Sequence, residues 1–410
     1  MLTLRLISLL GFFAMIGVAW LLSSHRRQLN VRILVGGVLL QFALAVLIMK
    51  TGPGYWVFSG IGTFFEVALD FVNSGSEMVF GPNYADFFFA FKVLPTIIFF
   101  SSLMAILYHF GLVQKLVRIF AMLMEFTLGT SGAETLSAAA NVFVGQTEAP
   151  LVVRPYVASM TMSELNAMMV GGFATIAGGV LAAYVGMGID ATHLVTASVI
   201  SAPAALVIAK VMLPETEKSM TLGTVTVEND ETYVNAVDAA ARGASQGLML
   251  ALNVGAMLIA FLALVAMGDW VIGWAGSWFG FEGEQSWSLA MILGYLFYPF
   301  AWLMGIESAD CFHAAELLGM KISVTEFIAY DQLATWMEPG SGVQLSDRTV
   351  MIVTYALCGF ANFGSIGIQL AGIGGIAPER RGDLAKLGVR AMIGGSLAAF
   401  MTACIAGVLN

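Results

Sequence analysis

The sequence predicts an all-α membrane protein with about eight transmembrane helices, two re-entrant helical hairpins and interfacial helices. Its 410 residues are 59% hydrophobic and only 11% charged, whereas soluble domains are about 25% charged. The mean hydropathy is +0.85, and several charge-free runs are as long as the roughly 20 residues that span a bilayer. Two polar stretches interrupt this apolar pattern, which indicates helices that enter the membrane without crossing it.

The first predicted span is 3–23, which carries a single charge, Arg5. It leads into His25 and two arginines rather than into a small-residue cleavage site, so it is a span and not a signal peptide. Further apolar segments long enough to be spans lie at 33–49, 93–114, 166–189, 191–209, 243–268, 349–378 and 391–409.

Segment 52–81 lies between the second and third spans and is rich in glycine and aromatic residues. Tyr55, Trp56, Phe64 and Phe65 suit the headgroup boundary, so this segment is predicted to be interfacial. Placing the amino terminus outside puts most of the 18 Lys and Arg residues on the cytoplasmic side. Both termini are therefore predicted outside, and 214–242 is predicted to be a cytoplasmic loop leading into an amphipathic helix.

The first polar interruption is 127–160. Ser131 and Glu134 form an S-x-x-E capping box that opens a short helix, and capping alone accounts for Glu134. This helix is predicted to run to about Val144, to break over 145–150 and to be followed by a second short helix. The segment is too broken for two full spans, which indicates a re-entrant hairpin.

The second interruption, 289–338, repeats this plan. A helix is predicted from Ser288, a break from Pro299 to Gly305, and another helix from Ser323 that carries Glu326. Interrupted segments at corresponding places in two halves are typical of inverted-repeat transporters with a site near the membrane midplane.

This organisation predicts a scaffold and a two-part transport domain. The predicted scaffold is 1–126 with span 243–268. The two halves of the transport domain are 127–242, with the hairpin 127–160, and 269–410, with the hairpin 289–338.

Segment 141–150, NVFVGQTEAP, places an amide and a carboxylate in apolar surroundings. A charge at bilayer depth costs about 2.5–3.5 kcal/mol, so Glu148 points to a substrate or ion site. A transporter, a channel and a membrane enzyme using Glu148 and Glu326 as acid and base are the competing classes. No phosphate-binding loop or clustered Cys and His ligands occur in the sequence, and channels rarely need two broken hairpins. A transporter driven by an ion gradient fits best.

Several runs resemble the concentrative nucleoside transporter family in order and spacing across essentially the whole chain. They are GTSGAETLSAAANVFVGQTEAPLVVRPY at 129–156, GGFATIAGGVLAAY at 171–184, AWLMGI at 301–306, EFIAY at 326–330 and CGFANFGSIGIQLAG at 358–372. The resemblance implies a cation-coupled nucleoside symporter of the bacterial inner membrane. It also implies a homotrimer in which a mobile transport domain moves against a scaffold, with no cofactor besides the coupling ion.

The resemblance also implies the substrate-binding residues. These are Gln146, Thr147, Glu148, Val180, Glu326, Phe360, Asn362 and Ser365. A nucleoside needs amides for the base edge and carboxylates that accept from the ribose hydroxyls. Purely structural roles stay open for some of these residues. Gln146 and Thr147 could cap half-helices, and Phe360 could be a core residue. Glu326 could complete a capping box with Ser323. The family usually has Asn where this chain has Thr325.

The resemblance assigns sodium to Asn141, Val144, Thr175 and Ile176. Amide, hydroxyl and carbonyl oxygens are ligands that a hard cation accepts. Thr175 could instead donate to a carbonyl of its own helix. Proton coupling in place of sodium, and the choice between uridine, adenosine and similar substrates, remain open.

Overall fold

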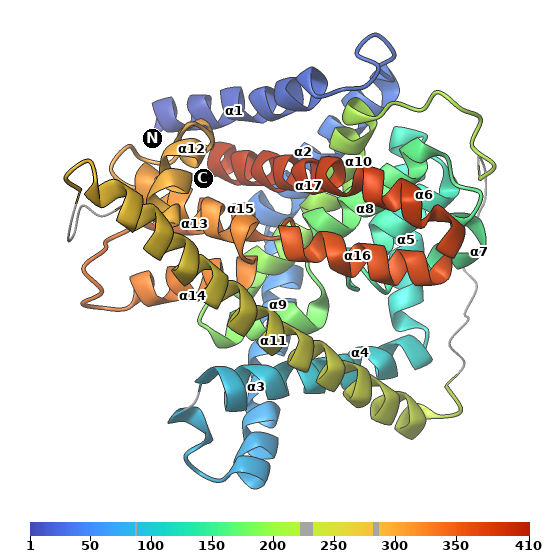
Figure 1. Ribbon diagram of the computed structural model, residues 1–410. Coiled ribbons are helices and arrows are strands. Elements are labelled where there is room, and N and C mark those ends of the chain that lie inside the picture. The colour runs from blue at the N-terminus through green and yellow to red at the C-terminus, as the bar shows by residue number, and fades with distance from the viewer. Residues whose placement is uncertain (87, 222–232, 282–286) are drawn as a thin grey trace.

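Every regular element that the computed structural model describes is a helix (Figure 1). The structure describes residues 1–410 except 87, 222–232 and 282–286. Within these residues no strand occurs, which confirms the predicted all-α class. In the described part of the chain, eight helices are long and apolar enough to cross a membrane, so the chain is a multi-pass membrane protein.

The chain begins with five helices. They are α1 (Leu2–Leu21), α2 (Val31–Lys50), α3 (Gly52–Phe80), α4 (Leu94–His109) and α5 (Leu112–Leu128), with short turns η1 (Tyr84–Asp86) and η2 (Phe88–Val93) before α4. The glycine- and aromatic-rich segment 52–81 is a single 29-residue helix, α3, that has the length and composition of a span. Its interfacial placement stays a prediction.

The first hairpin and the helices after it follow. They are α6 (Gly132–Ala140), η3 (Ala149–Val153), α7 (Arg154–Val157), α8 (Met162–Ala174), α9 (Gly178–Gly186), α10 (Ala191–Met212) and α11 (Ala236–Ser277). α6 ends at Ala140 rather than near Val144, and its returning arm is only the short pair η3 and α7. The predicted span 166–189 is interrupted between α8 and α9. Residues 222–232 of the predicted loop before α11 lie outside the described residues.

The second half contains α12 (Leu289–Leu303), α13 (Cys311–Ser323), α14 (Glu326–Met337), α15 (Asp347–Leu357), α16 (Phe363–Ile376), η5 (Pro378–Arg380) and α17 (Arg381–Leu409). The prediction that the second hairpin turns between Pro299 and Gly305 is wrong. Pro299 lies inside α12, where neighbouring helices can satisfy the backbone groups that proline frees. The hairpin consists of α13 and α14, and its tip is at Val324 and Thr325.

The span predicted at 349–378 is also two helices, α15 and α16, separated by the turn 358–362. Gly359 occupies this turn with a φ of +137°, which L side chains rarely adopt. A Cβ atom there would lie 2.6 Å from the carbonyl oxygen of Phe173, so only glycine lets this turn approach the end of α8.

The helices divide into a buried group and a peripheral group. Within an apolar stretch of 18 residues, 94% of α10 is buried inside the protein, whereas only 12% of α11 is. α17 packs closely on α8, since a Cβ atom at Gly395 would lie 2.3 Å from the Phe173 Cβ atom. The long α11 runs along α4 at the edge of the molecule (Figure 1), so its outer face is left for lipid or another subunit. The Arg5 Nε atom donates to the Asn410 carbonyl oxygen at 3.0 Å, so both termini lie together at the same end of the molecule.

Candidate functional site

Four non-helical turns meet inside the buried group of helices. They are the tip of the first hairpin after α6, the interruption between α8 and α9, the tip of the second hairpin, and the interruption between α15 and α16. The Gly178 N–H group donates to the Phe143 carbonyl oxygen at 3.4 Å, which joins the first two turns. The hydrogen bond from Asn362 to Glu326 joins the other two turns. Helix interruptions of this kind expose backbone polar groups only where they line a site or pack against protein.

Glu326 is the centre of one buried polar cluster. Its Oε1 atom accepts from the Tyr184 hydroxyl at 3.0 Å, and its Oε2 atom accepts from Asn362 Nδ2 at 2.8 Å. The Asn362 Oδ1 atom accepts from the Ser365 backbone N–H at 2.8 Å, so Asn362 caps α16. The structure therefore brings together three of the predicted substrate-binding residues, Glu326, Asn362 and Ser365. A carboxylate offers about four lone-pair positions, so these contacts leave room for a ligand hydroxyl to donate to it.

The capping-box alternative for Glu326 is wrong. Thr325 caps α14, and its hydroxyl accepts from the Phe327 N–H at 2.9 Å. Ser323 instead donates to the Gly319 carbonyl oxygen within its own helix. Because Thr325 supplies the cap, the Glu326 carboxylate is available to Tyr184 and Asn362.

Gln146 belongs to a second buried contact. Its Oε1 atom accepts from Gln369 Nε2 at 3.0 Å. α16 also lies close to the neighbouring residue, because a Cβ atom at Gly372 would be 3.0 Å from Thr147 Cγ2. The tip of the first hairpin thus rests on the same helix that Asn362 caps.

A cavity of about 360 Å³ lies on the other side of this tip. Val144, Gly145, Thr147 and Glu148 line it from the hairpin, and residues of α4, α5 and α11 line it from the opposite side. Its volume falls in the range of about 300–1,000 Å³ that is typical of small-molecule sites. Among the described residues, the Glu326 cluster does not line it. In this conformation the hairpin tip separates the predicted substrate residues into two groups.

Val180 and Phe360 complete the predicted set. Val180 is buried in the first turn of α9, close to the interruption after α8. Phe360 lies half-buried in the turn between α15 and α16. Both therefore lie in or next to the turns that meet inside the molecule.

The predicted sodium ligands lie on two turns that are in contact. Asn141 follows the last residue of α6, and its Oδ1 atom is buried without a hydrogen-bond partner in the described part of the chain. α8 passes closely, since a Cβ atom at Gly171 would lie 3.2 Å from Asn141 Nδ2. Thr175 donates to the Gly171 carbonyl oxygen at 3.0 Å. This is the bond to the preceding turn that threonine commonly makes in a helix.

This arrangement fits a hard cation. The donated proton of Thr175 leaves its oxygen lone pairs available. Val144 and Ile176 lie in the turns that follow α6 and α8, whose carboxyl-terminal ends carry partial negative charge. An unpaired amide oxygen beside two such helix ends has the ligand chemistry that sodium requires, since all the oxygens are hard and uncharged.

Family models match most of the chain. The model for the C-terminus of the Na+ dependent nucleoside transporters matches residues 193–407, and the N-terminal model matches 10–83. A third model, described as Gate: nucleoside recognition, matches 90–191. An uncharacterized transporter of Haemophilus influenzae is 45% identical over 408 residues, which is 98% of this chain and 97% of that protein. The chain belongs to the concentrative, Na+-dependent nucleoside transporter family.

Other members of the family extend this comparison. Human solute carrier family 28 member 3 is 43% identical over 417 residues, which is 99% of this chain but 60% of the human protein. The chain thus spans about 60% of the length of this curated relative. The structure of CNTnw in an inward-facing substrate-bound state superposes with a TM-score of 0.91 at 43% identity and covers 99% of this chain and 97% of CNTnw.

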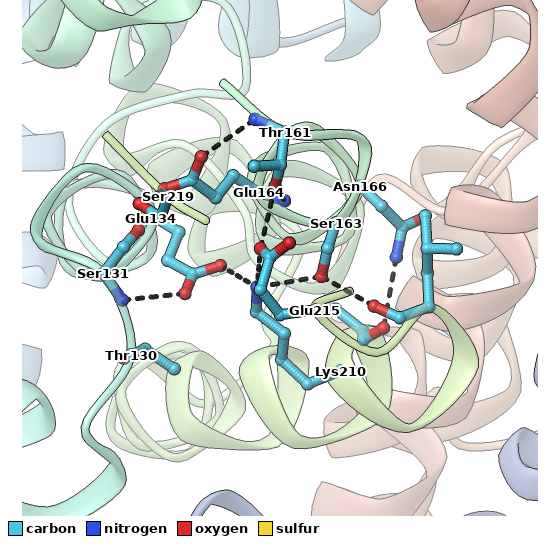
Figure 2. A network of polar contacts seen from close by, with 12 residues as sticks. Thr130, Ser131, Glu134, Thr161, Ser163, Glu164, Asn166, Lys210, Glu215 and Ser219 are labelled. Atoms are coloured by element: carbon cyan, nitrogen blue, oxygen red, sulfur yellow. Dashed lines mark hydrogen bonds and ion pairs between the residues drawn. The ribbon is translucent and has the colours of Figure 1, made fainter. Parts of the chain in front are cut away.

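The present chain also contains a buried polar network that the sequence did not predict (Figure 2). Lys210, near the end of α10, is 5% exposed, and its Nζ atom lies 2.6 Å from Glu134 Oε2. It also donates to Ser163 Oγ at 2.9 Å and lies 3.4 Å from Glu215 Oε2. Capping therefore explains only one oxygen of Glu134, the one that accepts from the Ser131 N–H at 2.8 Å.

Glu164 joins the same network to the segment that follows α10. Its Oε1 atom accepts from the hydroxyls of Ser219 and Thr221, and its Oε2 atom accepts from the Thr161 N–H at 2.9 Å. The Gly132 N–H donates to the Thr221 carbonyl oxygen at 2.9 Å. The start of the first hairpin, the start of α8 and the end of α10 are therefore connected as one unit.

We expect Lys210→Met to lower the apparent melting temperature of the purified protein by several degrees. The substitution leaves the buried Glu134 carboxylate without its cation, and a buried charge that loses its partner is strongly destabilising. Thermal unfolding in detergent measures the effect. Lys218→Met, at an exposed position eight residues away in the same segment, is the matched control. Equal melting temperatures for the two variants would contradict a stabilising role for this ion pair.

Proposed function

We propose that this chain is a sodium-coupled nucleoside symporter that imports nucleosides into a bacterial cell by alternating access. The family description supports nucleosides and sodium. The observation that carries the proposal is the meeting of Glu326, Asn362 and Tyr184, because a buried carboxylate with spare lone pairs suits the vicinal hydroxyls of ribose. No part of this function requires a cofactor or a chemical change in the substrate.

The proposed substrate residues have different tasks. Glu326, Asn362 and Ser365 would bind the ribose. Gln146, Thr147 and Glu148 would contact the base, with Val180 and Phe360 adding apolar contact. The cavity beside Thr147 and Glu148 would be the approach by which nucleoside reaches or leaves the site from one side of the membrane.

Sodium is favoured over the proton as coupling ion by the chemistry of the predicted ligands. Asn141 and Thr175 offer an amide and a hydroxyl, and Val144 and Ile176 offer backbone carbonyls. These groups bind a hard cation but do not take up a proton near neutral pH. Proton coupling would have to use a carboxylate, and it is the second candidate.

Contacts between the two hairpins and their neighbouring helices support a division into moving and static parts. The network around Lys210 and the contacts of Glu326 and Gln369 join both hairpins with α8, α10 and α16. We propose that 127–242 and 269–410 form the transport domain and that 1–126 with 243–268 forms the scaffold. The exposed outer face of α11 would make the subunit contacts of a homotrimer in the inner membrane.

Uptake into proteoliposomes tests this function. Labelled uridine and adenosine should accumulate when a sodium gradient is imposed, and accumulation should collapse without it. A proton gradient that drives uptake in the absence of sodium would establish the second candidate. Recovery of chemically altered nucleoside from incubation with the purified protein would instead indicate an enzyme.

We expect Asn141→Ala to weaken the sodium dependence of uptake while the protein stays folded. Nucleoside affinity should fall only at limiting sodium, because two ligands that help each other bind do so reciprocally. Asn166→Ala is the matched control. Asn166, on α8, is likewise buried with an unpaired Oδ1 atom among the described residues, but it donates to the Ala209 carbonyl oxygen next to Lys210. The sodium concentration for half-maximal uptake distinguishes the variants, and an unchanged value in Asn141→Ala would remove this residue from the sodium site.

A further inference from the structure

Gln369 is a fully buried polar residue in the middle of the largely apolar helix α16. Its Nε2 atom makes two hydrogen bonds to different segments of the chain. One goes to the Met169 backbone carbonyl oxygen of α8 at 3.1 Å, and the other goes to Gln146 Oε1 at the tip of the first hairpin at 3.0 Å. Gln369 therefore connects a helix backbone to a residue expected to read the nucleobase.

The Met169 carbonyl determines which way both amides point. A carbonyl oxygen only accepts, so the NH2 group of Gln369 must face it. Reversing the Gln369 amide would place two oxygens 3.1 Å apart with no proton between them. Because the same NH2 group faces Gln146, the oxygen of Gln146 must be the atom that meets it. The orientation of Gln146 thus follows from the hydrogen-bond pattern, which is the basis on which amides are assigned.

The surrounding chain accommodates this pair closely. A Cβ atom at Gly172 would lie 2.8 Å from Gln369 Nε2 and 2.9 Å from Gln146 Cβ, so glycine makes the contact possible. Asn362, Ser365 and Gln369 are spaced three and four residues apart, which places them on one face of α16. Gln369 therefore continues the polar face that begins at the Glu326 cluster.

Packing alone does not account for a glutamine at this position. The Gln369 Oε1 atom is buried without a hydrogen-bond partner among the described residues, which is unfavourable. A leucine would fill similar space without that unpaired oxygen. We therefore explain the amide by the hydrogen bonds that its NH2 group donates to Gln146 and Met169, and not by a gain in stability.

We propose that Gln369 is a positioning residue that makes Gln146 present its NH2 group, a hydrogen-bond donor, to the nucleobase. This inference rests on the proposed function. A donor at this place selects bases whose facing edge carries a carbonyl acceptor, such as uracil, over bases that carry an amino group there, such as cytosine. Gln369 sets this preference without touching the ligand.

Binding of uridine and cytidine to the purified protein in saturating sodium, measured by calorimetry, tests this inference. The wild-type protein should bind uridine more tightly. Gln369→Leu should reduce the ratio of the two affinities about two- to tenfold, the worth of one neutral hydrogen bond. Gln369→Met, which removes the amide but keeps an unbranched chain, should do the same and serves if the leucine variant folds poorly.

A double-mutant cycle separates positioning from a general structural effect. If Gln369 acts through Gln146, adding Gln369→Leu to Gln146→Leu should leave the affinity ratio unchanged. Gln41→Leu is the matched control, because Gln41 is a buried glutamine that donates to Thr402 Oγ1 at 3.2 Å, also with an unpaired oxygen, in the scaffold helix α2. It should keep the wild-type ratio.

Three results would overturn the inference. One is a wild-type preference for cytidine, another is an unchanged ratio in both Gln369 variants, and the third is additive effects of Gln146→Leu and Gln369→Leu. Failure of the proposed function looks different, because the wild-type protein would then bind neither nucleoside, and this inference would fall with it. Loss of the ratio in Gln146→Leu but not in the Gln369 variants would leave the transport function intact and refute only the positioning role.

Discussion

Glu326→Gln should reduce nucleoside uptake by about one to two orders of magnitude. Hydrogen bonds to a charged acceptor are worth about 1.5–3 kcal/mol each, and the amide would lose that charge. It would also turn an NH2 group toward either the Tyr184 hydroxyl or Asn362 Nδ2, both of which donate to Glu326. Initial rates of uridine uptake into proteoliposomes, together with nucleoside affinity by calorimetry, measure the loss.

The control for this substitution is Glu316→Gln on the preceding helix of the same hairpin. Glu316 pairs with His313 at 3.1 Å near the surface, so the same chemical change there leaves the site intact. Melting temperatures of both variants show whether they fold. Normal uptake by a folded Glu326→Gln protein would show that this carboxylate does not bind substrate.

Cross-linking the proposed scaffold to the proposed transport domain should stop transport completely. α4 and α9 approach closely at Ser101 and Gly179, where a Cβ atom at Gly179 would lie 3.4 Å from Ser101 Oγ. Paired cysteines at these two positions are therefore close enough for a disulfide. The substitutions belong in a background in which Cys311, Cys358 and Cys404, all buried, are replaced. Oxidation should abolish uptake and reduction should restore it.

The rate of this cross-link should also change when sodium and nucleoside are added, because ligands shift the balance between conformations that they bind unequally. Single-cysteine variants treated with the same oxidant control for damage unrelated to the bridge. Full uptake by protein that is quantitatively cross-linked would exclude movement of one body against the other. Only local opening of the hairpins would then remain.

The tips of the two hairpins show where sequence reasoning succeeds and where it fails. The first was located to within a few residues, because Gly145 lies in the non-helical turn after α6 and Pro150 lies in the first turn of η3. The second was placed at Pro299 and Gly305, yet the chain turns at Val324 and Thr325. A proline is tolerated inside α12, so the strongest local signal was misleading there.

The buried lysine and the two unassigned polar partners needed the tertiary structure. Lys210 lies near the end of an apolar span, and no local pattern indicates that its charge is buried against Glu134. Tyr184 ends a run that was noted without a role, and only its contact with Glu326 reveals one. Gln369 could have been suspected from its spacing after Asn362 and Ser365 on one helix face.

The sequence by itself determined the membrane class and the all-α fold, because the hydrophobicity of each segment is a local property. Only the tertiary structure decided which polar groups meet. Glu326 and Asn362 are 36 residues apart in the chain, and Gln146 and Gln369 are 223 apart. A hydrogen bond depends on distances of about 3 Å, and no local propensity specifies which distant turns approach that closely.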